Sequence, residues 1–322
     1  MELIDLYRNS NMHKKIKLDK DADMINHAYI LSSADNLLLD AYASFVVQDI
    51  CCEDKNSPCM QCLNCQKIMH GNMVDLAVYP RGEKSLVVED ISNIVVDSYI
   101  RPMESKYKIY ILKNFDLCTV QGQNKLLKTL EEPPRNVIFI MTCGNPDAIL
   151  PTIRSRAKIV SESALDKSVI QEYLQSRGVT NAATIAGMSD GRITTALALS
   201  EKRNACEMVD SVLDILNRLK SSKDILSCSS KILSYKKDIG LFLETMVSVL
   251  RDVAIVNYSG INFVDYKVPI QNLSAVYSAE MIDYIVAKIT EIFNKMDFNC
   301  NVTGLIDQLL LDILEVKFLC QK

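Results

Sequence analysis

The chain has 322 residues, enough for one to three domains with a substantial hydrophobic core. Hydrophobic residues make up 48%, charged residues 24%, and the net charge is -4, so a strong overall attraction to nucleic acid is excluded. No apolar run approaches the roughly 18 residues of a membrane span, and the first ten residues have no secretory leader pattern. Eleven cysteines therefore predict metal ligands or free thiols in a reducing cytoplasm rather than disulfides.

Short apolar runs alternate with helical patterns in the first half of the chain. The predicted strands are 28–32, 76–79, 109–112 and 137–141. Strands that alternate with helices favour a parallel sheet with helices on both faces. From about residue 166 the pattern is helical almost throughout, and the first predicted helices there are 170–176, 182–188 and 192–199. The expected domains are an α/β domain, a small helical domain and a larger helical domain, at 1–163, 164–203 and 204–322.

One stretch, 124–156, contains a helix, a strand and an arginine-bearing turn in close succession. Leucines at helical spacing run up to the proline pair at 133–134, which ends the helix. The unbroken apolar run that follows is short enough for a strand covered on both faces. Beyond it, Arg154 and Arg156 place guanidinium groups beside the end of that strand.

A cysteine cluster lies early in the chain, where Cys59, Cys62 and Cys65 follow the pair Cys51-Cys52. Two C-x-x-C steps that share a cysteine, with one upstream thiol, can supply four thiolates to tetrahedral zinc. Such a metal would tie together a loop that has no apolar core of its own. Free buried cysteines are one alternative, which the strict spacing among polar residues disfavours. A redox C-x-x-C pair is another, and its usual strand-then-motif context is missing.

The segments L-L-K-T-L-E-E-P-P (126–134) and L-P-T-I-R-S-R (150–156) resemble the AAA+ core of bacterial DNA polymerase III clamp-loader subunits. The resemblance covers the motifs up to about Arg192, and the last third of the chain matches only in its helical character. It implies an AAA+ P-loop-type parallel sheet with a zinc module at about 51–65. A helical lid (164–203) and a helical collar for oligomerisation (204–322) are expected to follow.

The resemblance also implies that the zinc is structural and has four cysteine ligands, with no open position for chemistry. The spacing to the first ligand varies among such subunits, so Cys51 and Cys52 compete for this place. We favour Cys52 because Glu53 follows it, as in many relatives. The expected ligands are Cys52, Cys59, Cys62 and Cys65.

A nucleotide-binding phosphate loop needs glycines, a lysine for the phosphates and a Ser or Thr for Mg²⁺. In the family, this loop follows a strand that His27–Ser32 resembles. Here the corresponding segment begins at Ser33 and has no glycine, while Leu39 replaces the lysine and Asp40 replaces the Ser or Thr. A carboxylate at that position repels a triphosphate, so we expect this subunit to bind no ATP.

The acidic box of such ATPases holds Mg²⁺ and orients the attacking water. Here Lys113 and Asn114 replace its two acids. Asp116 comes a turn later and is expected to cap the helix that follows. Two lost elements in one chain predict an inactive member of an ATPase family.

Arg156, preceded by Ser155, matches the arginine of the family's S-R-C motif, although Ala157 replaces the usual cysteine. The resemblance implies an arginine finger, which can stabilise a transferring phosphoryl group in trans. An ordinary surface or ion-paired arginine is the alternative. Arg192 resembles the lid arginine that senses nucleotide in active members, and a purely structural role is the alternative there.

The resemblance implies a stator, a rigid subunit without bound ATP, in the clamp loader at the replication fork of a bacterial nucleoid. The implied partners are gamma/tau-type ATPase subunits, the delta subunit, the sliding clamp transiently, and primed DNA through the complex; no membrane is involved. Two other functions compete with this one. The chain could be an active gamma/tau-type ATPase, against which the missing motifs argue. It could also be a stand-alone zinc-containing nucleic-acid-binding module, against which the net charge argues.

Overall fold

The computed structural model describes residues 1–81, 86–201, 205–259, 271–296 and 301–319. The chain divides into two compact units, of which the first comprises Met1–Leu165 and Arg192–Thr194. The second comprises Asp166–Gly191 and Thr195–Lys322. The predicted boundary at 163–164 lies two residues from this division. The predicted boundary at 203–204 falls outside the described residues.

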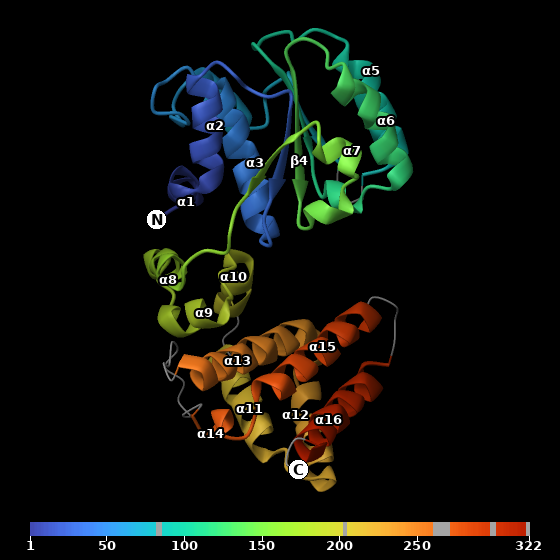
Figure 1. Cartoon of the computed structure of the whole chain (residues 1–322). Coiled ribbons are helices and arrows are strands. Elements are labelled where there is room, and N and C mark those ends of the chain that lie inside the picture. The colour runs from blue at the N-terminus through green and yellow to red at the C-terminus, as the bar shows by residue number, and fades with distance from the viewer. Residues whose placement is uncertain (82–85, 202–204, 260–270, 297–300, 320–322) are drawn as a thin grey trace. The chain divides into compact units, whose positions relative to one another are not determined.

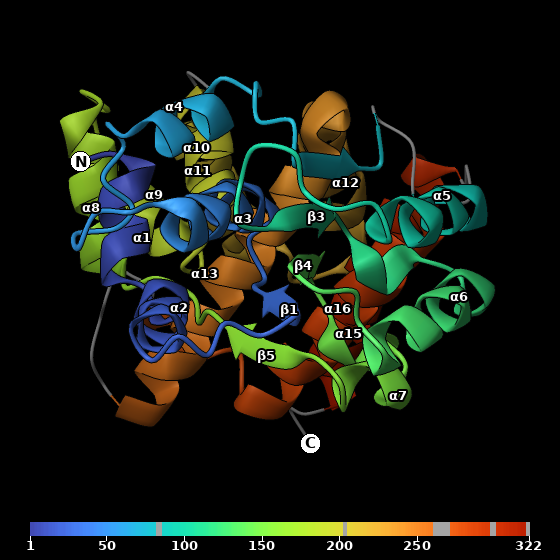
Figure 2. The same cartoon turned by 90° about the horizontal axis from the view of Figure 1, so that it is seen from above.

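The first unit is a five-stranded parallel sheet with helices on both faces (Figure 1). Its strands are β1 (Ala28–Ser32), β2 (Leu76–Tyr79), β3 (Lys108–Leu112), β4 (Val137–Cys143) and β5 (Lys158–Ser161). Its helices are α1 (Leu3–Asn9), α2 (Asn11–Asp21), α3 (Asn36–Cys51), α4 (Leu63–Met69), α5 (Val88–Ser98), α6 (Val120–Glu131) and α7 (Pro151–Arg154), with 3-10 turns η1 (Phe115–Leu117) and η2 (Pro146–Ala148). Helices α1 to α3 lie on one side of the sheet and α5 to α7 on the other (Figure 2).

The strand order is β2-β3-β4-β1-β5, which places β1 between two parallel neighbours. Tyr29 of β1 is paired with Ile140 of β4 on one side and with Lys158 of β5 on the other. The four predicted strands are confirmed, with β3 beginning one residue earlier and β4 ending two residues later than expected. Strand β5 was not predicted, because its four residues alternate too briefly to give a periodic signal.

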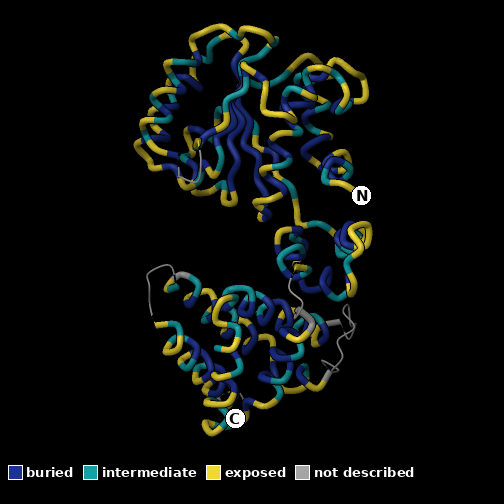
Figure 3. Tube along the Cα trace, turned by 180° about the vertical axis from the view of Figure 1, so that it is seen from behind, coloured by how far each residue is buried: buried dark blue, intermediate teal, exposed yellow. Residues whose placement is uncertain are grey.

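The core lies on both faces of this sheet, and the strands are its most deeply buried part (Figure 3). All seven residues of β4 are buried, as expected of a strand covered by helices on two sides. On the face of α5 and α6, Tyr110 stacks on Phe139 with ring centroids 5.5 Å apart. On alternate positions, Ile111 and Ile140 are equally buried and side chains point to the opposite face.

The second unit is helical throughout its described part, which confirms the predicted change of pattern after residue 166. Its helices are α8 (Lys167–Ser176), α9 (Ala182–Met188), α10 (Ile193–Glu201), α11 (Ala205–Arg218), α12 (Ile225–Leu233), α13 (Ile239–Ser259), α14 (Gln271–Ser274), α15 (Ala279–Met296) and α16 (Val302–Leu319), with 3-10 turns η3 (Ser222–Asp224) and η4 (Lys236–Asp238). The first two residues of α10, Ile193 and Thr194, are grouped with the first unit. The apolar stripe of α11 is buried, including Val212 and Leu216. Among the described residues, no helix combines the length and hydrophobicity that crossing a membrane requires.

Candidate functional site

The segment that replaces the phosphate loop joins β1 to α3. It lies at the carboxyl end of an interior strand and at the N-terminus of a helix, the place where α/β folds bind phosphate. Ser33 is buried in this connection, and Leu39 is 2% exposed because it packs into the core from the first turns of α3. Leu39 therefore contributes apolar packing where an ATPase would present an ammonium group.

Asp40 and Lys113, the replacements in the two nucleotide-binding motifs, form an ion pair with each other. Lys113 Nζ lies 2.9 Å from Asp40 Oδ2, with side-chain exposures of 33% and 51%. An ion pair this exposed stabilises the fold by only about 0–1 kcal/mol. Its importance is local: the ammonium group of Lys113, at the end of β3, neutralises the Asp40 carboxylate of α3, at the place where Mg²⁺ would lie in an active relative. Next to it, Asn114 has a left-handed backbone, and its N–H donates to Thr142 Oγ1.

The prediction that Asp116 caps the following helix is wrong. Thr119 is the N-cap of α6, and its side chain accepts from the N–H of Gly122. Asp116 lies in η1 and its Oδ2 accepts from the N–H groups of Gly144 and Asn145, at 3.1 and 3.0 Å. The carboxylate therefore holds the loop after β4, which local sequence signals could not reveal because its partners are 28 and 29 residues away.

Asp35 was missed as a site residue, although an Asp directly before a helical apolar run is a recognisable N-cap signal. It is 3% exposed and caps α3, because its Oδ1 accepts from the N–H groups of Leu37 and Leu38. A carboxylate thus occupies the N-terminal end of the helix that would face the phosphates in an active relative.

Arg156 lies just beyond α7, between β4 and β5, and its side chain is 35% exposed. One terminal nitrogen lies 2.9 Å from Glu131 Oε1 at the end of α6. The other donates to the carbonyl of Thr152 at 2.7 Å and to Ser155 Oγ at 3.2 Å. These contacts fix the guanidinium group in direction while leaving part of it accessible.

The neighbouring arginines have different surroundings. Arg154 pairs with the exposed Asp147, at 2.6 Å between Nη1 and Oδ1. Arg192 directly precedes α10 and is partly buried. Arg156, which contacts residues of α6 and α7, therefore differs in its surroundings from Arg154 and Arg192.

The cysteine cluster contains Cys52 rather than Cys51. The sulfur atoms of Cys52, Cys59, Cys62 and Cys65 all lie within 4.8 Å of one another, so these four thiols could bind a metal ion. Cys52 Sγ and Cys62 Sγ are 3.9 Å apart, close to the edge of about 3.8 Å expected for a tetrahedron with Zn–S bonds of about 2.3 Å. The four soft sulfur donors fit zinc.

Backbone N–H groups point at two of these sulfur atoms, as suits thiolates. The N–H of Cys62 lies 3.2 Å from Cys59 Sγ, and that of Cys65 lies 3.5 Å from Cys62 Sγ. For Cys59, burial raises the pKa, but backbone N–H groups of Gln61 and Cys62 outweigh it and lower the pKa to about 7. Burial raises the pKa of Cys51 to about 12, and it also raises the pKa values of Cys52 and Cys65 within the cluster. It is therefore the position of the sulfur atoms that excludes Cys51 from the cluster.

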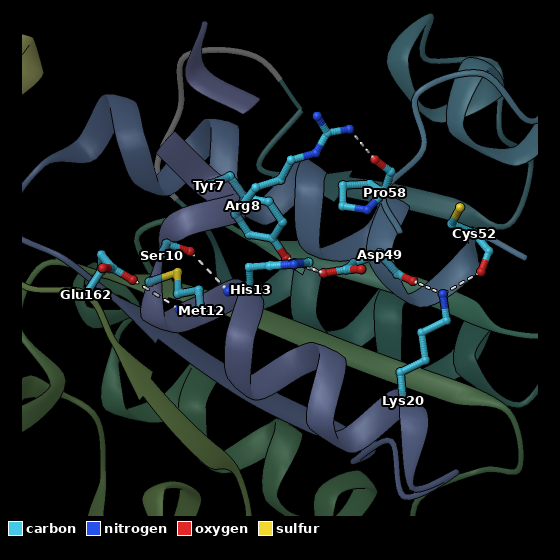
Figure 4. A network of polar contacts seen from close by, with 10 residues as sticks. All are labelled: Tyr7, Arg8, Ser10, Met12, His13, Lys20, Asp49, Cys52, Pro58 and Glu162. Atoms are coloured by element: carbon cyan, nitrogen blue, oxygen red, sulfur yellow. Dashed lines mark hydrogen bonds and ion pairs between the residues drawn. The ribbon is translucent and has the colours of Figure 1, made fainter. Parts of the chain in front are cut away.

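Polar contacts join the cysteine module to the first three helices (Figure 4). Arg8 donates to the carbonyl of Pro58 at 2.9 Å, and Lys20 donates to carbonyls at the C-terminal end of α3, where a cation is favoured. Beside them Asp49, whose side chain is fully buried, accepts from Tyr7 Oη at 3.0 Å and lies 2.7 Å from His13 Nδ1. The module is therefore part of the packed unit and not a free appendage.

Comparisons with known proteins relate the chain to subunits of DNA polymerase III. The family model described as DNA polymerase III, delta subunit, matches residues 8–166. The delta' subunit of DNA polymerase III from Bacillus subtilis is 24% identical over 306 residues, which cover 92% of this chain and 93% of that relative. The gamma subunit from Buchnera aphidicola (subspecies Acyrthosiphon pisum) is 27% identical over 239 residues, 70% of this chain and 66% of that relative.

Among solved structures, a gamma-subunit-related protein from Thermotoga maritima aligns with 98% of this chain and 100% of its own, at 15% identity and a TM-score of 0.44. The parallel sheet, the family match and the cysteine cluster together define a clamp-loader protein of the AAA+ class. Within DNA polymerase III, the chain is a delta-prime-like subunit, because a delta' relative matches it over nearly its whole length.

Proposed function

We propose that the chain is a stator of the clamp loader: it binds no ATP, has no ATPase activity of its own, and supplies Arg156 in trans to a neighbouring ATPase subunit. The observation that carries the proposal is the partly exposed guanidinium group of Arg156, oriented by Glu131 and Thr152. The ion pair of Lys113 with Asp40 supports the loss of nucleotide binding, since it neutralises the metal-holding positions.

The remaining parts of the proposal follow from the same class of protein. Gamma/tau-type subunits and the delta subunit would be its stable partners, and the sliding clamp and primed DNA would be engaged through the complex in the bacterial cytoplasm, at the nucleoid's replication fork. The four-cysteine cluster would hold structural zinc. Residues 164–203 would act as the lid, 204–322 as the collar that assembles the ring, and Arg192 as a remnant of nucleotide sensing.

The test of the arginine finger is the ATPase activity of the reconstituted clamp loader that contains Arg156→Ala. Stimulated turnover at the affected site should fall by a factor on the order of 10³ or more, because the charge on the transferring phosphoryl group loses its partner. Arg154→Ala is the matched control, since it removes a nearby arginine that pairs with the exposed Asp147. Equal turnover of the Arg156→Ala and wild-type complexes, with assembly intact, would refute the role.

An active gamma/tau-type ATPase is the second candidate, and the similarity to a gamma subunit favours it. Calorimetry of the isolated chain with Mg²⁺ and millimolar ATP separates the two. The stator requires no detectable heat of binding, whereas micromolar affinity would show that the segment 33–40 binds nucleotide. A stand-alone nucleic-acid-binding module would instead bind DNA by itself with a steep salt dependence.

A further inference from the structure

One buried carboxylate, that of Asp35, is shared by the first turns of two helices. Its contacts with the N–H groups of Leu37 and Leu38, at 3.1 and 3.3 Å, make it the N-cap of α3. Its Oδ2 also accepts from the backbone N–H of Thr194 at 3.1 Å, and Thr194 Oγ1 donates to Oδ1. Thr194 is the second residue of α10 and belongs, with Arg192 and Ile193, to the first compact unit.

This arrangement differs from an ordinary helix cap, in which the residue just before a helix caps that helix alone. Asp35 and Thr194 are 159 residues apart in sequence, yet two helix N-termini direct N–H groups at the same group. Helix N-termini carry partial positive charge and attract anions, and in phosphate loops that anion is the nucleotide's phosphate. Here the anion is covalently part of the chain and 3% exposed.

The positive charge that a bound Mg²⁺ ion would contribute also has a counterpart among the side chains nearby. Asp40, in the same helix as the Asp35 cap, is neutralised by Lys113 from the end of β3. The negative and positive charges that a nucleotide and its metal would bring are therefore supplied by side chains. Both sets of contacts come from residues within the first unit.

We propose that the former nucleotide site works as an internally filled clamp, in which the carboxylate of Asp35 takes the place of a phosphate group and fastens the first turn of α10 to that of α3. The start of α10 is then held in the same way whether or not nucleotide is present. The clamp goes beyond the proposed function, since it concerns the chain's own helices and not the action of Arg156 on a neighbour.

Hydrogen–deuterium exchange of the isolated full-length chain tests the clamp. In Asp35→Ala, the amides of Leu37, Leu38 and Thr194 should all exchange about 10- to 100-fold faster, because each loses a charge-assisted acceptor. Asp35→Asn distinguishes the effect on α3 from the effect on α10. An asparagine still caps α3, but it lacks the charge and the second carboxylate oxygen. It should accelerate exchange around Thr194 while the first turn of α3 stays protected.

Thr194→Val removes only the hydroxyl donor and keeps the fold testable if Asp35→Ala does not fold. It should accelerate exchange at the start of α10 about tenfold, whereas the matched control Thr180→Val, at an exposed threonine, should leave that turn unchanged. Unaltered exchange around residue 194 in the folded Asp35 variants, or in Thr194→Val where these do not fold, would overturn the clamp. Because this experiment needs neither ATP nor partners, its failure is distinguishable from failure of the arginine-finger role.

Discussion

Removal of metal from the cysteine cluster should destabilise the first unit by an amount that the structure allows us to work out. The outermost ligands, Cys52 and Cys65, close a loop of 14 residues, counting from one cysteine to the other. By the loop-entropy relation used for disulfides, a cross-link over about 14 residues restricts the unfolded chain by roughly 3 kcal/mol. We expect chelation to lower the free energy of unfolding by about this amount.

The melting temperature should fall correspondingly. For a unit of this size, Met1–Leu165 with Arg192–Thr194, each kcal/mol of stability corresponds to about 2–4 °C in melting temperature. The expected decrease is therefore about 6–12 °C. It should concern the α/β unit because Gln48, Arg8 and Lys20 join the module to the first three helices.

The assay is differential scanning calorimetry of the full chain, with metal content measured before and after chelation. Cys52→Ser should lose metal and melt early. Cys51→Ser is the matched control and should retain both metal and stability, since Cys51 lies outside the four-sulfur group. If a sample shown to be free of metal had the same melting temperature as the metal-bound sample, the structural role would be refuted. If Cys51→Ser lost metal and Cys52→Ser retained it, the assignment of Cys52 as a ligand would be refuted.

Two further predictions concern buried polar groups. Asp49→Ala should lower the free energy of unfolding, measured in urea, by roughly 2–5 kcal/mol, because Tyr7 and His13 are left buried without this partner. The control Asp21→Ala, at an exposed position, should change the free energy of unfolding little. Equal effects of the two substitutions would contradict the reasoning. Burial, with a smaller contribution from Lys220, lowers the pKa of Lys317 to about 8, so unfolding takes up a proton between pH 8 and 10.5 and stability rises with pH across that range. As the pH rises from 8 to 10.5, the free energy of unfolding of the wild type should increase by roughly 1–3 kcal/mol relative to that of Lys317→Met. A difference between the two proteins that does not change with pH would contradict the low pKa.

The sequence predicted the fold well where burial gives a strong periodic signal. The strands β1 and β4 are apolar throughout because helices cover both faces of the sheet, and such runs are visible without a structure. Strand β5 escaped prediction because its residues are half exposed and only four in number. In the candidate site, the C-x-x-C spacing predicted a cluster, but only the chain's path could decide that Cys52 and not Cys51 turns toward it.

The contacts of the segment between β1 and α3 were beyond prediction for a different reason. The sequence reveals which motif residues are missing, since Leu39 and Asp40 stand at fixed positions after a recognisable strand. It does not reveal what their replacements contact, because Lys113 reaches Asp40 across 73 residues and Thr194 reaches Asp35 across 159. Asp116 illustrates the same limit: a local capping rule misplaced a carboxylate whose partners follow the next strand.

Under the proposed function, these contacts would explain how a chain can lose one half of an ATPase mechanism and keep the other. Asp35 contacts Thr194 and Asp40 contacts Lys113. Arg156 is held by Glu131 and Thr152 instead. The two sets share no residue, so substitutions that abolish nucleotide binding need not disturb the arginine. Asp35 also stabilises the helix directly: without its carboxylate, the N–H of the buried Leu38 would lose its acceptor in the first turn of α3. The carboxylate of Asp35 supplies that acceptor, and it does so, among the described residues, without a hydrogen bond to those that hold Arg156.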